Sequence, residues 1–302
     1  KDQIELAEVK GWIQTNEDDL PCNLETSWND MPLQLAELFL LPTLDSIRGN
    51  THARIKVTSS LKEPRLKGYL ALNSCRFRVP YLKCSYFLDD TLWVDSRSFQ
   101  FKQGRLKDGL GGRATLNGKI SHFLFKDWEY SFNLDSISNL QVLNEPRFVK
   151  GDYYYGQGRI NGNAILSGNE ATAQITVNAQ AQRGTKIIVP LDQFSEDQSY
   201  EFIRFVDPSD TLILTQQEQD VQKDVSGLDV RFNLGLDPQS EVQLIVNSEQ
   251  GDQIKGVGNG DLLFTMTKEG DIRLNGDYGF TGGKYSFNMG NLASKNFDIL
   301  QG

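Results

Sequence analysis

Apolar and polar residues alternate with a period of two along most of the chain. In residues 227–236, which read GLDVRFNLGL, every second side chain is apolar, and Asp229, Arg231 and Asn233 stand between them. Successive side chains of a β-strand point to opposite faces, so this pattern predicts a strand with one apolar and one polar face. Similar runs recur along the chain, separated by short stretches such as SLKEP, FKQG and TKEG that are typical of turns. The pattern predicts an all-β fold of consecutive antiparallel strands.

Two segments interrupt the alternation. In residues 29–48, Leu33, Ala36 and Leu40 follow a helical spacing after a proline that suits a first helical turn. We therefore expect a short helical insertion there. Residues 192–226 are polar and lack a clear period, which predicts an irregular segment followed by a solvated linker.

The apolar faces of these strands need a partner, and two kinds of fold supply one. A β-sandwich or closed barrel would bury them against one another. Against that fold, the alternation continues for most of roughly 250 residues, near the size at which single cores usually stop growing. Gly and Ala also recur at inward positions, for example at Gly118, Gly162 and Ala179. Such small residues would leave room for a guest molecule or let an open sheet curl tightly, and the pattern alone leaves both folds open.

The overall charge narrows the choice of partners. The chain carries a net charge of -9 with a pI near 4.9, which argues against nucleic acid as a partner and against adsorption onto anionic lipid head groups. We expect Lys and Arg to be scattered among the carboxylates. No run of about 18 apolar residues predicts a membrane-spanning helix. The chain begins without methionine and ends at DILQG, and we interpret it as a piece of a longer protein.

Residues capable of catalysis or metal binding are few. Three cysteines, Cys22, Cys75 and Cys84, make neither a disulfide framework nor a zinc set. Free buried thiols are the favoured interpretation, and a disulfide between Cys75 and Cys84 is the alternative. The two histidines, His52 and His122, have no partner at a catalytic or metal-binding spacing. These residues predict no catalytic site and no metal site.

Two glycine-rich stretches resemble phosphate-binding loops only superficially. GLGGRA at 109–114 would need a helix after it, yet RATLNGKI continues as a strand, so we expect a hairpin turn. In GVGNG at 256–260 the glycines alternate within a predicted strand. We therefore expect that the protein binds no cofactor and is not an enzyme.

Several longer stretches resemble one protein family, in order along the chain. They are SSLKEPRLKGYLAL, KDGLGGRATLNGKISHFLFKDWEYSFNL, YYYGQGRINGNAILSG, RGTKIIVPL, FIRFVD, DPQSEVQLIVNSEQGDQIKGVGNGDLLF and GDYGFTGGKYSFNMGNLASKNFDILQG. Together they are similar to the C-terminal part of the TamB family, the AsmA-like translocation and assembly module of diderm bacteria, in the form found in Bacteroidota.

This resemblance implies a fold and a place in the cell. The fold would be a β-taco over residues 1–302: one long antiparallel sheet, with one or two short helices, curled into an open half-pipe with an apolar groove. The parent protein would be anchored in the inner membrane, cross the periplasm and pair with an outer-membrane barrel of the TamA or TamL type. Both membranes would be reached through segments outside this chain.

The implied function is a bridge that carries phospholipid, or another amphiphile with acyl chains, between the two membranes for outer-membrane biogenesis. The tails would lie against apolar residues of the groove. The candidates are Leu70, Leu72, Val94, Leu116, Ile120, Ile160, Ile175, Val177, Leu228, Val230, Phe232, Leu234, Leu236, Leu244, Phe264, Met266, Leu274 and Phe280.

A second function fits the same fold. The sheet would act as an assembly scaffold or chaperone in protein secretion. It would hold strands of outer-membrane barrels and autotransporters along its edge. A structural or adhesin module with a closed core is a third hypothesis. A lipid bound in the groove would distinguish the bridge from both.

Overall fold

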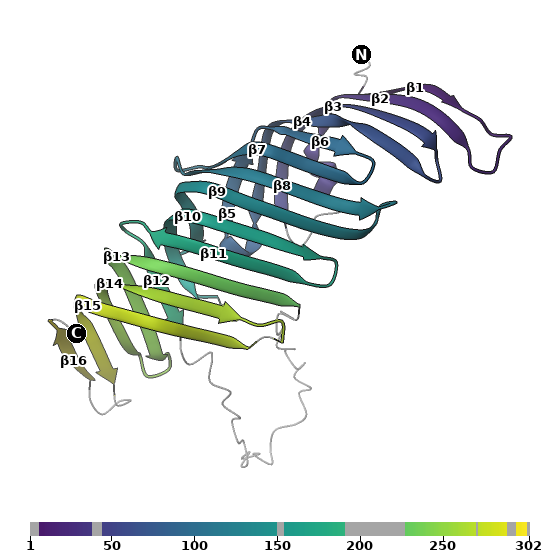
Figure 1. Ribbon diagram of the computed structural model, residues 1–302. Coiled ribbons are helices and arrows are strands. Elements are labelled where there is room, and N and C mark those ends of the chain that lie inside the picture. Colours follow the sequence, from purple (N-terminus) through teal and green to yellow (C-terminus); the bar gives the residue numbers. More distant parts are fainter. Residues whose placement is uncertain are drawn as a thin grey trace, which may run out of the picture.

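The computed structural model describes residues 6–37, 44–149, 154–190, 227–269, 271–288 and 294–300. Within them the chain forms one curled sheet of 16 strands and two short 3-10 helices (Figure 1). This confirms the predicted all-β fold.

The elements follow in chain order. They are β1 (Ala7–Ile13), β2 (Pro21–Pro32), η1 (Leu33–Ala36), β3 (Asp45–Ser60), β4 (Pro64–Val79), η2 (Pro80–Leu82), β5 (Cys84–Leu88), β6 (Thr91–Asp95), β7 (Ser98–Asp108), β8 (Arg113–Phe123), β9 (Lys126–Glu145), β10 (Tyr155–Asn169), β11 (Ala173–Ala181), β12 (Lys186–Pro190), β13 (Leu228–Asn247), β14 (Asp252–Met266), β15 (Ile272–Asn288) and β16 (Ser294–Ile299).

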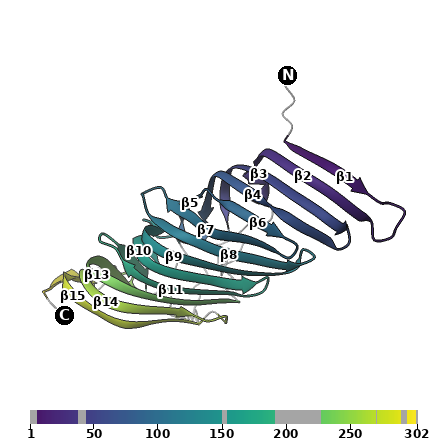
Figure 2. The same ribbon diagram turned by 45° about the horizontal axis from the view of Figure 1, so that its top comes forward.

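Neighbours in the sheet are neighbours in the sequence. The strands run in order from β1 at one end to β16 at the other, so the two chain ends lie at opposite ends of the sheet (Figures 1 and 2). Two positions in this order are each shared by two short strands. β5 and β6 both lie between β4 and β7, and β11 and β12 both lie between β10 and β13. The chain therefore advances steadily along one axis.

One junction departs from the predicted antiparallel order. β13 runs parallel to both β11 and β12, while the other strand pairs are antiparallel. Parallel neighbours need a long connection to bring the chain back to the same end of the sheet. Residues 191–227 supply that length, whereas most other strands are joined by tight turns. The sheet is therefore mixed.

In the 29–48 segment, β2 continues to Pro32, a short 3-10 helix, η1, follows directly, and β3 begins at Asp45. Met31 and Pro32 continue the ladder with β3, so the helical turn starts only after them. Residues 38–43 and the predicted irregular segment at 192–226 lie outside the described residues.

Inserted residues bend the strands. In β9, Ser136 and Asn139 both adopt φ of 51°, in the left-handed region. Each adds one residue opposite β10, and the register shifts there. As a result Leu134, Ile137 and Leu140, spaced three apart, stay on one face of the sheet. These bulges turn the strand while keeping its apolar side chains on the inside.

Similar register shifts occur on other strands across the sheet. They separate Trp28 from Met31, Arg48 from Asn50, Phe101 from Gly104, and Leu236 from Ser240. Because β-bulges increase local twist and bend, their repetition on successive strands curls the whole sheet.

The buried core lies inside this bend. Leu140 of β9 is 2% exposed, and Tyr86 of β5 belongs to the same apolar cluster. The Tyr86 hydroxyl donates a hydrogen bond of 2.7 Å to the carbonyl oxygen of Gln141. The Gln141 N–H donates at 2.7 Å to the carboxylate of Asp108, at the end of β7. These bonds tie β5 and β7 to β9, beyond their immediate neighbours in the sheet.

Candidate functional site

The predicted groove residues lie on a single face of the sheet. Residues paired on neighbouring strands share a face, so the register shows which side chains lie together. One continuous row runs from β3 to β14: Ala53, Leu70, Leu92, Phe101, Gly118, Phe132, Leu166, Ile175, Val230 and Met266. A second runs from β8 to β15: Leu116, Leu134, Ala164, Val177, Phe232, Phe264 and Leu274. We call this apolar side the inner face and the opposite side the outer face.

The candidate residues on the inner face divide into two groups by burial. Five are buried against other side chains of the sheet, and these are Val94, Ile160, Leu234, Leu236 and Met266. The half-buried ones are Leu70, Leu72, Leu116, Ile120, Ile175, Val177, Leu228, Val230, Phe232, Leu244, Phe264 and Phe280. Leu274 pairs with Phe264 on β15, but its side chain lies outside the described residues. The half-buried group forms an apolar surface above a packed floor.

No second layer of chain stacks on this surface within the described residues. The extensive contacts join strands that are neighbours in the sheet, together with the contacts of β5, β7 and η2 with β9 and of η1 with β3. The burial of the floor residues therefore comes from the curl of the sheet itself, and a sandwich is excluded for this part of the chain.

Some glycines of the inner face are covered by aromatic rings. The ring of Phe132 lies over Gly118, and a β-carbon at Gly118 would collide with it. The ring of Phe280 lies over Gly256, where a β-carbon would stand 2.6 Å from ring atom Cδ1. The space left by these two glycines is thus filled by the neighbouring strand, and the ring adds apolar area to the groove floor.

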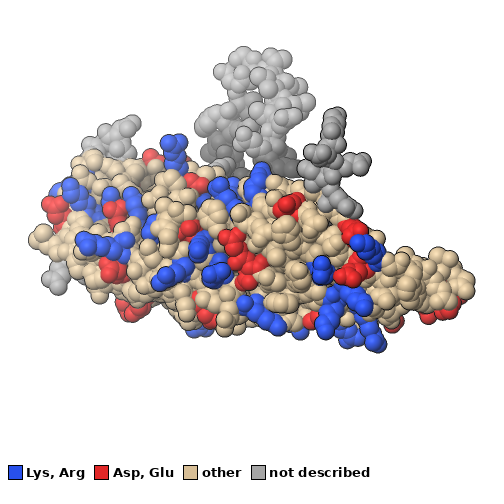
Figure 3. Space-filling view, turned by 90° about the horizontal axis from the view of Figure 1, so that it is seen from above, with Lys and Arg blue, Asp and Glu red and all other residues tan. Residues whose placement is uncertain are grey.

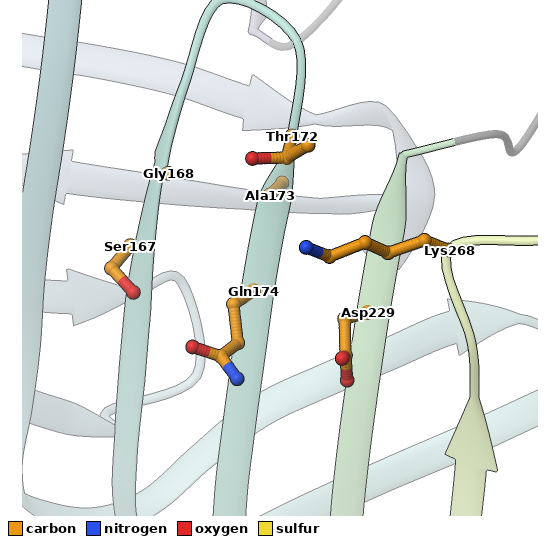
Figure 4. Close-up of a pocket in the computed structure, with 7 residues that line it drawn as sticks. All are labelled: Ser167, Gly168, Thr172, Ala173, Gln174, Asp229 and Lys268. Carbon is orange, nitrogen blue, oxygen red and sulfur yellow. The ribbon is translucent and has the colours of Figure 1, made fainter.

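Two hollows lie at the ends of the C-terminal strands and on their outer face. The smaller, about 170 Å³, lies between the β10–β11 turn, the start of β13 and Lys268. Figure 4 shows the Lys268 side chain reaching across β13 toward Thr172, with Asp229 and Gln174 beside it. The larger, about 480 Å³, has a mainly apolar lining, to which Asn178, Asn233 and Asp261 add polar groups.

The cysteines are buried free thiols, as the favoured interpretation predicted. Cys75 stands opposite Leu88 and Cys84 opposite Val79, so the two sulfurs are not cross-strand partners. Burial raises the pKa of each of these thiols to about 11. Because the thiolate is the reactive form, they are inert at neutral pH.

Both histidines accept backbone hydrogen bonds, one at a turn and the other at a bulge. The His122 side chain is 5% exposed, and its Nδ1 accepts a 3.1 Å hydrogen bond from the Phe125 N–H. Burial lowers the pKa of His122, so the ring is neutral at pH 7. The Nδ1 of His52 accepts a 3.2 Å bond from the Asp30 N–H at the bulge in β2. Among the described residues no group of His, Cys, Asp and Glu is arranged to hold a metal ion.

The GLGG stretch forms the predicted turn between β7 and β8. One carboxylate oxygen of Asp108 accepts hydrogen bonds from the N–H groups of Leu110, at 2.7 Å, and Gly112, at 2.8 Å. The amides that a phosphate loop would aim at its ligand are therefore already paired. The GVGNG glycines lie within β14, as expected.

The outer face carries a feature that whole-chain composition hides. Residues 46–126 contain 16 Lys and Arg but only 5 Asp and Glu, whereas the remaining residues contain 15 and 35. The expectation that basic residues are scattered evenly among carboxylates was therefore wrong. Counting charges strand by strand would have revealed this local net charge of +11.

Comparison with known proteins gives one match. The family model described as the TamB C-terminal domain matches residues 103–302. No curated protein and no solved structure matches the chain. In the described part of the chain, no helix has the length and apolar character needed to cross a membrane.

Proposed function

The chain belongs to the TamB family, and from that premise we propose that it carries phospholipid, or another amphiphile with acyl chains, along its inner face. The family is associated with outer-membrane assembly, is envelope-associated, acts as a structural or transport bridge and works with outer-membrane partners. The observation that carries the proposal is the continuous apolar inner face, which stays uncovered by a second layer in the described residues.

The energetics of an acyl chain suit such a surface. Each methylene group exposed to water costs about 0.8 kcal/mol, so exposing a whole sixteen-carbon tail to water costs roughly 12 kcal/mol. An apolar surface that covers the tail removes this cost. The main strand order has fourteen successive positions, which at about 4.8 Å each span roughly 60 Å. A tail that moves along the sheet meets apolar side chains on successive strands from β3 to β15.

Uniformity of the surface also matters for movement. A bridge needs no position that binds a tail much more tightly than its neighbours, because a lipid would stop there. The half-buried inner-face residues provide comparable apolar contact on successive strands, such as Val177, Phe232 and Phe264. The polar head group would remain in water at the open side of the groove.

The proposal includes a cellular setting. The parent protein, anchored in the inner membrane, would cross the periplasm and meet an outer-membrane barrel of the TamA or TamL type. The steady advance of the strands along one axis supports a bridging role, since the sheet extends from one chain end to the other (Figure 1).

Photocrosslinking in cells that contain the parent protein tests this function. Photoreactive residues placed at Val230 and Phe232 should capture phospholipid, because both side chains lie on the inner face. Probes at Asp229 and Arg231 provide matched controls on the outer face of the same strand. Equal lipid labelling at all four positions would contradict transport along the groove.

One observation favours the assembly scaffold as a second candidate. β1 pairs with β2 alone in the described residues, and its Val9 and Trp12 are 64% and 54% exposed. An unpaired strand edge with exposed apolar side chains can accept a strand from another protein. A probe at Lys10 in the same experiment should capture outer-membrane proteins if this candidate is correct, while the inner-face probes capture no lipid.

A further inference from the structure

The positive charge of residues 46–126 is concentrated on the outer face. The residues that alternate with the inner-face side chains of β3, β4, β7 and β8 are repeatedly basic. We call the following set the basic band: Arg54, Lys56, Arg65, Lys67, Arg76, Arg78, Lys102, Arg105, Lys107, Arg113 and Lys119. Figure 3 shows basic side chains along most of the visible face, with one group of them toward the end of the sheet that begins with β1.

The sheet places like charges directly opposite one another in and beside this band. The three cross-strand pairs are Arg48 with Arg76, Lys56 with Lys67, and Lys107 with Arg113. Like charges at directly opposed positions destabilise a sheet. The fold therefore places like charges side by side at three positions, and only the pair of Lys107 and Arg113 has no carboxylate opposite it or within ion-pair distance in the described residues.

Carboxylates relieve part of this repulsion, because Glu37 lies 3.6 Å from Arg48 and Asp95 of β6 stands opposite Lys67 on its other side. Arg54 and Arg78 each have a carboxylate at 3.7 Å, from Glu25 and Asp45. Within the described residues, no carboxylate comes within the 4 Å of an ion pair to Lys56, Lys67, Arg76, Lys107 or Arg113. The cations at the centre of the band are therefore available to bind an external anion.

A strained apolar turn adjoins the band. The two-residue turn between β8 and β9 consists of Leu124 and Phe125, with φ of 50° and 62°. Two positive φ values define a type I′ turn, which strongly favours Asn-Gly. Nevertheless this turn exposes three large apolar side chains in succession, since Phe123, Leu124 and Phe125 are 54%, 38% and 48% exposed. Strain of this kind is retained where the side chains have a role.

The turn and the band face the same way. Phe123 alternates with the inward His122, so it stands on the outer-face side, and the Arg97 guanidinium lies 5.5 Å from its ring centre. Within the band the Trp93 ring is 47% exposed and lies 6.0 Å from the ammonium of Lys102. Exposed aromatic rings beside cations are typical of surfaces that meet the head-group layer of a membrane.

We propose that the outer face of β3 to β8 docks onto an anionic lipid surface. The basic band contacts the anionic head groups, and the side chains of Phe123 and Leu124 enter the layer beneath them. A nucleic acid or an acidic protein would neutralise the band equally well, but a soluble polyanion offers no apolar medium for the turn. This docking uses the face of the sheet opposite to the one proposed for transport.

Vesicle co-sedimentation of the protein tests the docking. The protein should sediment with vesicles of phosphatidylcholine and phosphatidylglycerol, and not with phosphatidylcholine alone. Neutralising two cations in Arg76→Gln/Lys107→Gln should weaken this binding by roughly 25-fold, because each cation near an anionic leaflet contributes about fivefold. The matched control Arg231→Gln/Arg273→Gln removes the same charge from the outer face elsewhere and should bind as the unchanged protein does.

A second variant separates the apolar turn from overall folding. Phe123→Ser/Leu124→Asn keeps Phe125 stacked on His122 and places at the φ of 50° a residue that tolerates it. It should melt at the same or a higher temperature and yet bind the anionic vesicles less. Val230→Asp, in the groove, should bind them as before, so failure of transport and failure of docking are distinguishable. Equal loss in the control pair, or binding to nucleic acid without binding to vesicles, would overturn the proposal.

Discussion

Gly118 and Phe132 show how single residues build the inner face. They are paired on β8 and β9, and the ring of Phe132 occupies the space in which a side chain at Gly118 would stand. A glycine beneath an aromatic ring lets the ring lie flat against the backbone of its neighbour. The pair thus offers a smooth apolar surface, which a protruding side chain at either position would interrupt.

Substitution of Gly118 should therefore cost more than its strand position suggests. Gly118→Val would favour an extended backbone, but its side chain collides with the Phe132 ring, and we expect a loss of about 1–3 kcal/mol in the free energy of unfolding. Urea denaturation measures this loss. The double variant Gly118→Val/Phe132→Ala removes the collision and should lose less than the sum of the two single variants. Strict additivity would show that the two side chains do not interact.

At the scale of the element, the bulges of β9 determine the curl. Ser136 and Asn139 both occupy the left-handed region, which is unfavourable for most side chains and least so for Gly and Asn. Without those two inserted residues, Ile137 and Leu140 would not follow Leu134 on the inner face. The bend and the core inside it therefore depend on the same two backbone positions.

Two substitutions at one bulge test this dependence. Asn139→Gly should leave the stability unchanged or slightly higher, whereas Asn139→Val should lower the free energy of unfolding by about 1–2 kcal/mol. The backbone N–H of residue 139, which donates to Asn161, is retained in both variants. Chemical denaturation provides the comparison, and equal stability of the two would mean that the bulge relaxes without its left-handed residue.

The elements also show what could be predicted from the sequence. The period of two placed Leu116, Phe232 and Phe264 on one face, because alternation is a local property that survives in the folded sheet. The parallel pairing of β11 with β13 depends on chain return over a long connection, which no local pattern encodes. Before β3, strand pairing extends through Met31 and Pro32, and the helical turn of η1 begins at Leu33, where the helical spacing of apolar residues starts.

At the scale of the whole molecule, the strands of the sheet contact mainly the strands next to them. The middle strands have a partner on each side and enclose the core around Leu140, whereas β1 and β16 each pair on one side in the described residues. Structures held together by nearest-neighbour contacts unfold in parts, with stability approximately the sum of local terms. Opening should therefore begin at the outer strands.

Hydrogen exchange measured by mass spectrometry tests this gradient. Amides of β9 near Leu140 should exchange slowest, and those of β1 should exchange fastest, because protection follows the free energy of local opening. Uniform protection from β1 to β15 would instead indicate a single cooperative unit.

Because the strands follow one another in order, the length of the sheet depends on the number of its strands. Each added hairpin would extend the sheet by two strand spacings, or roughly 10 Å, and would touch only the strands on either side of it. Under the proposed bridging role, duplication or loss of a hairpin would match the protein to a wider or narrower gap between two membranes, with every other pairing left as it was.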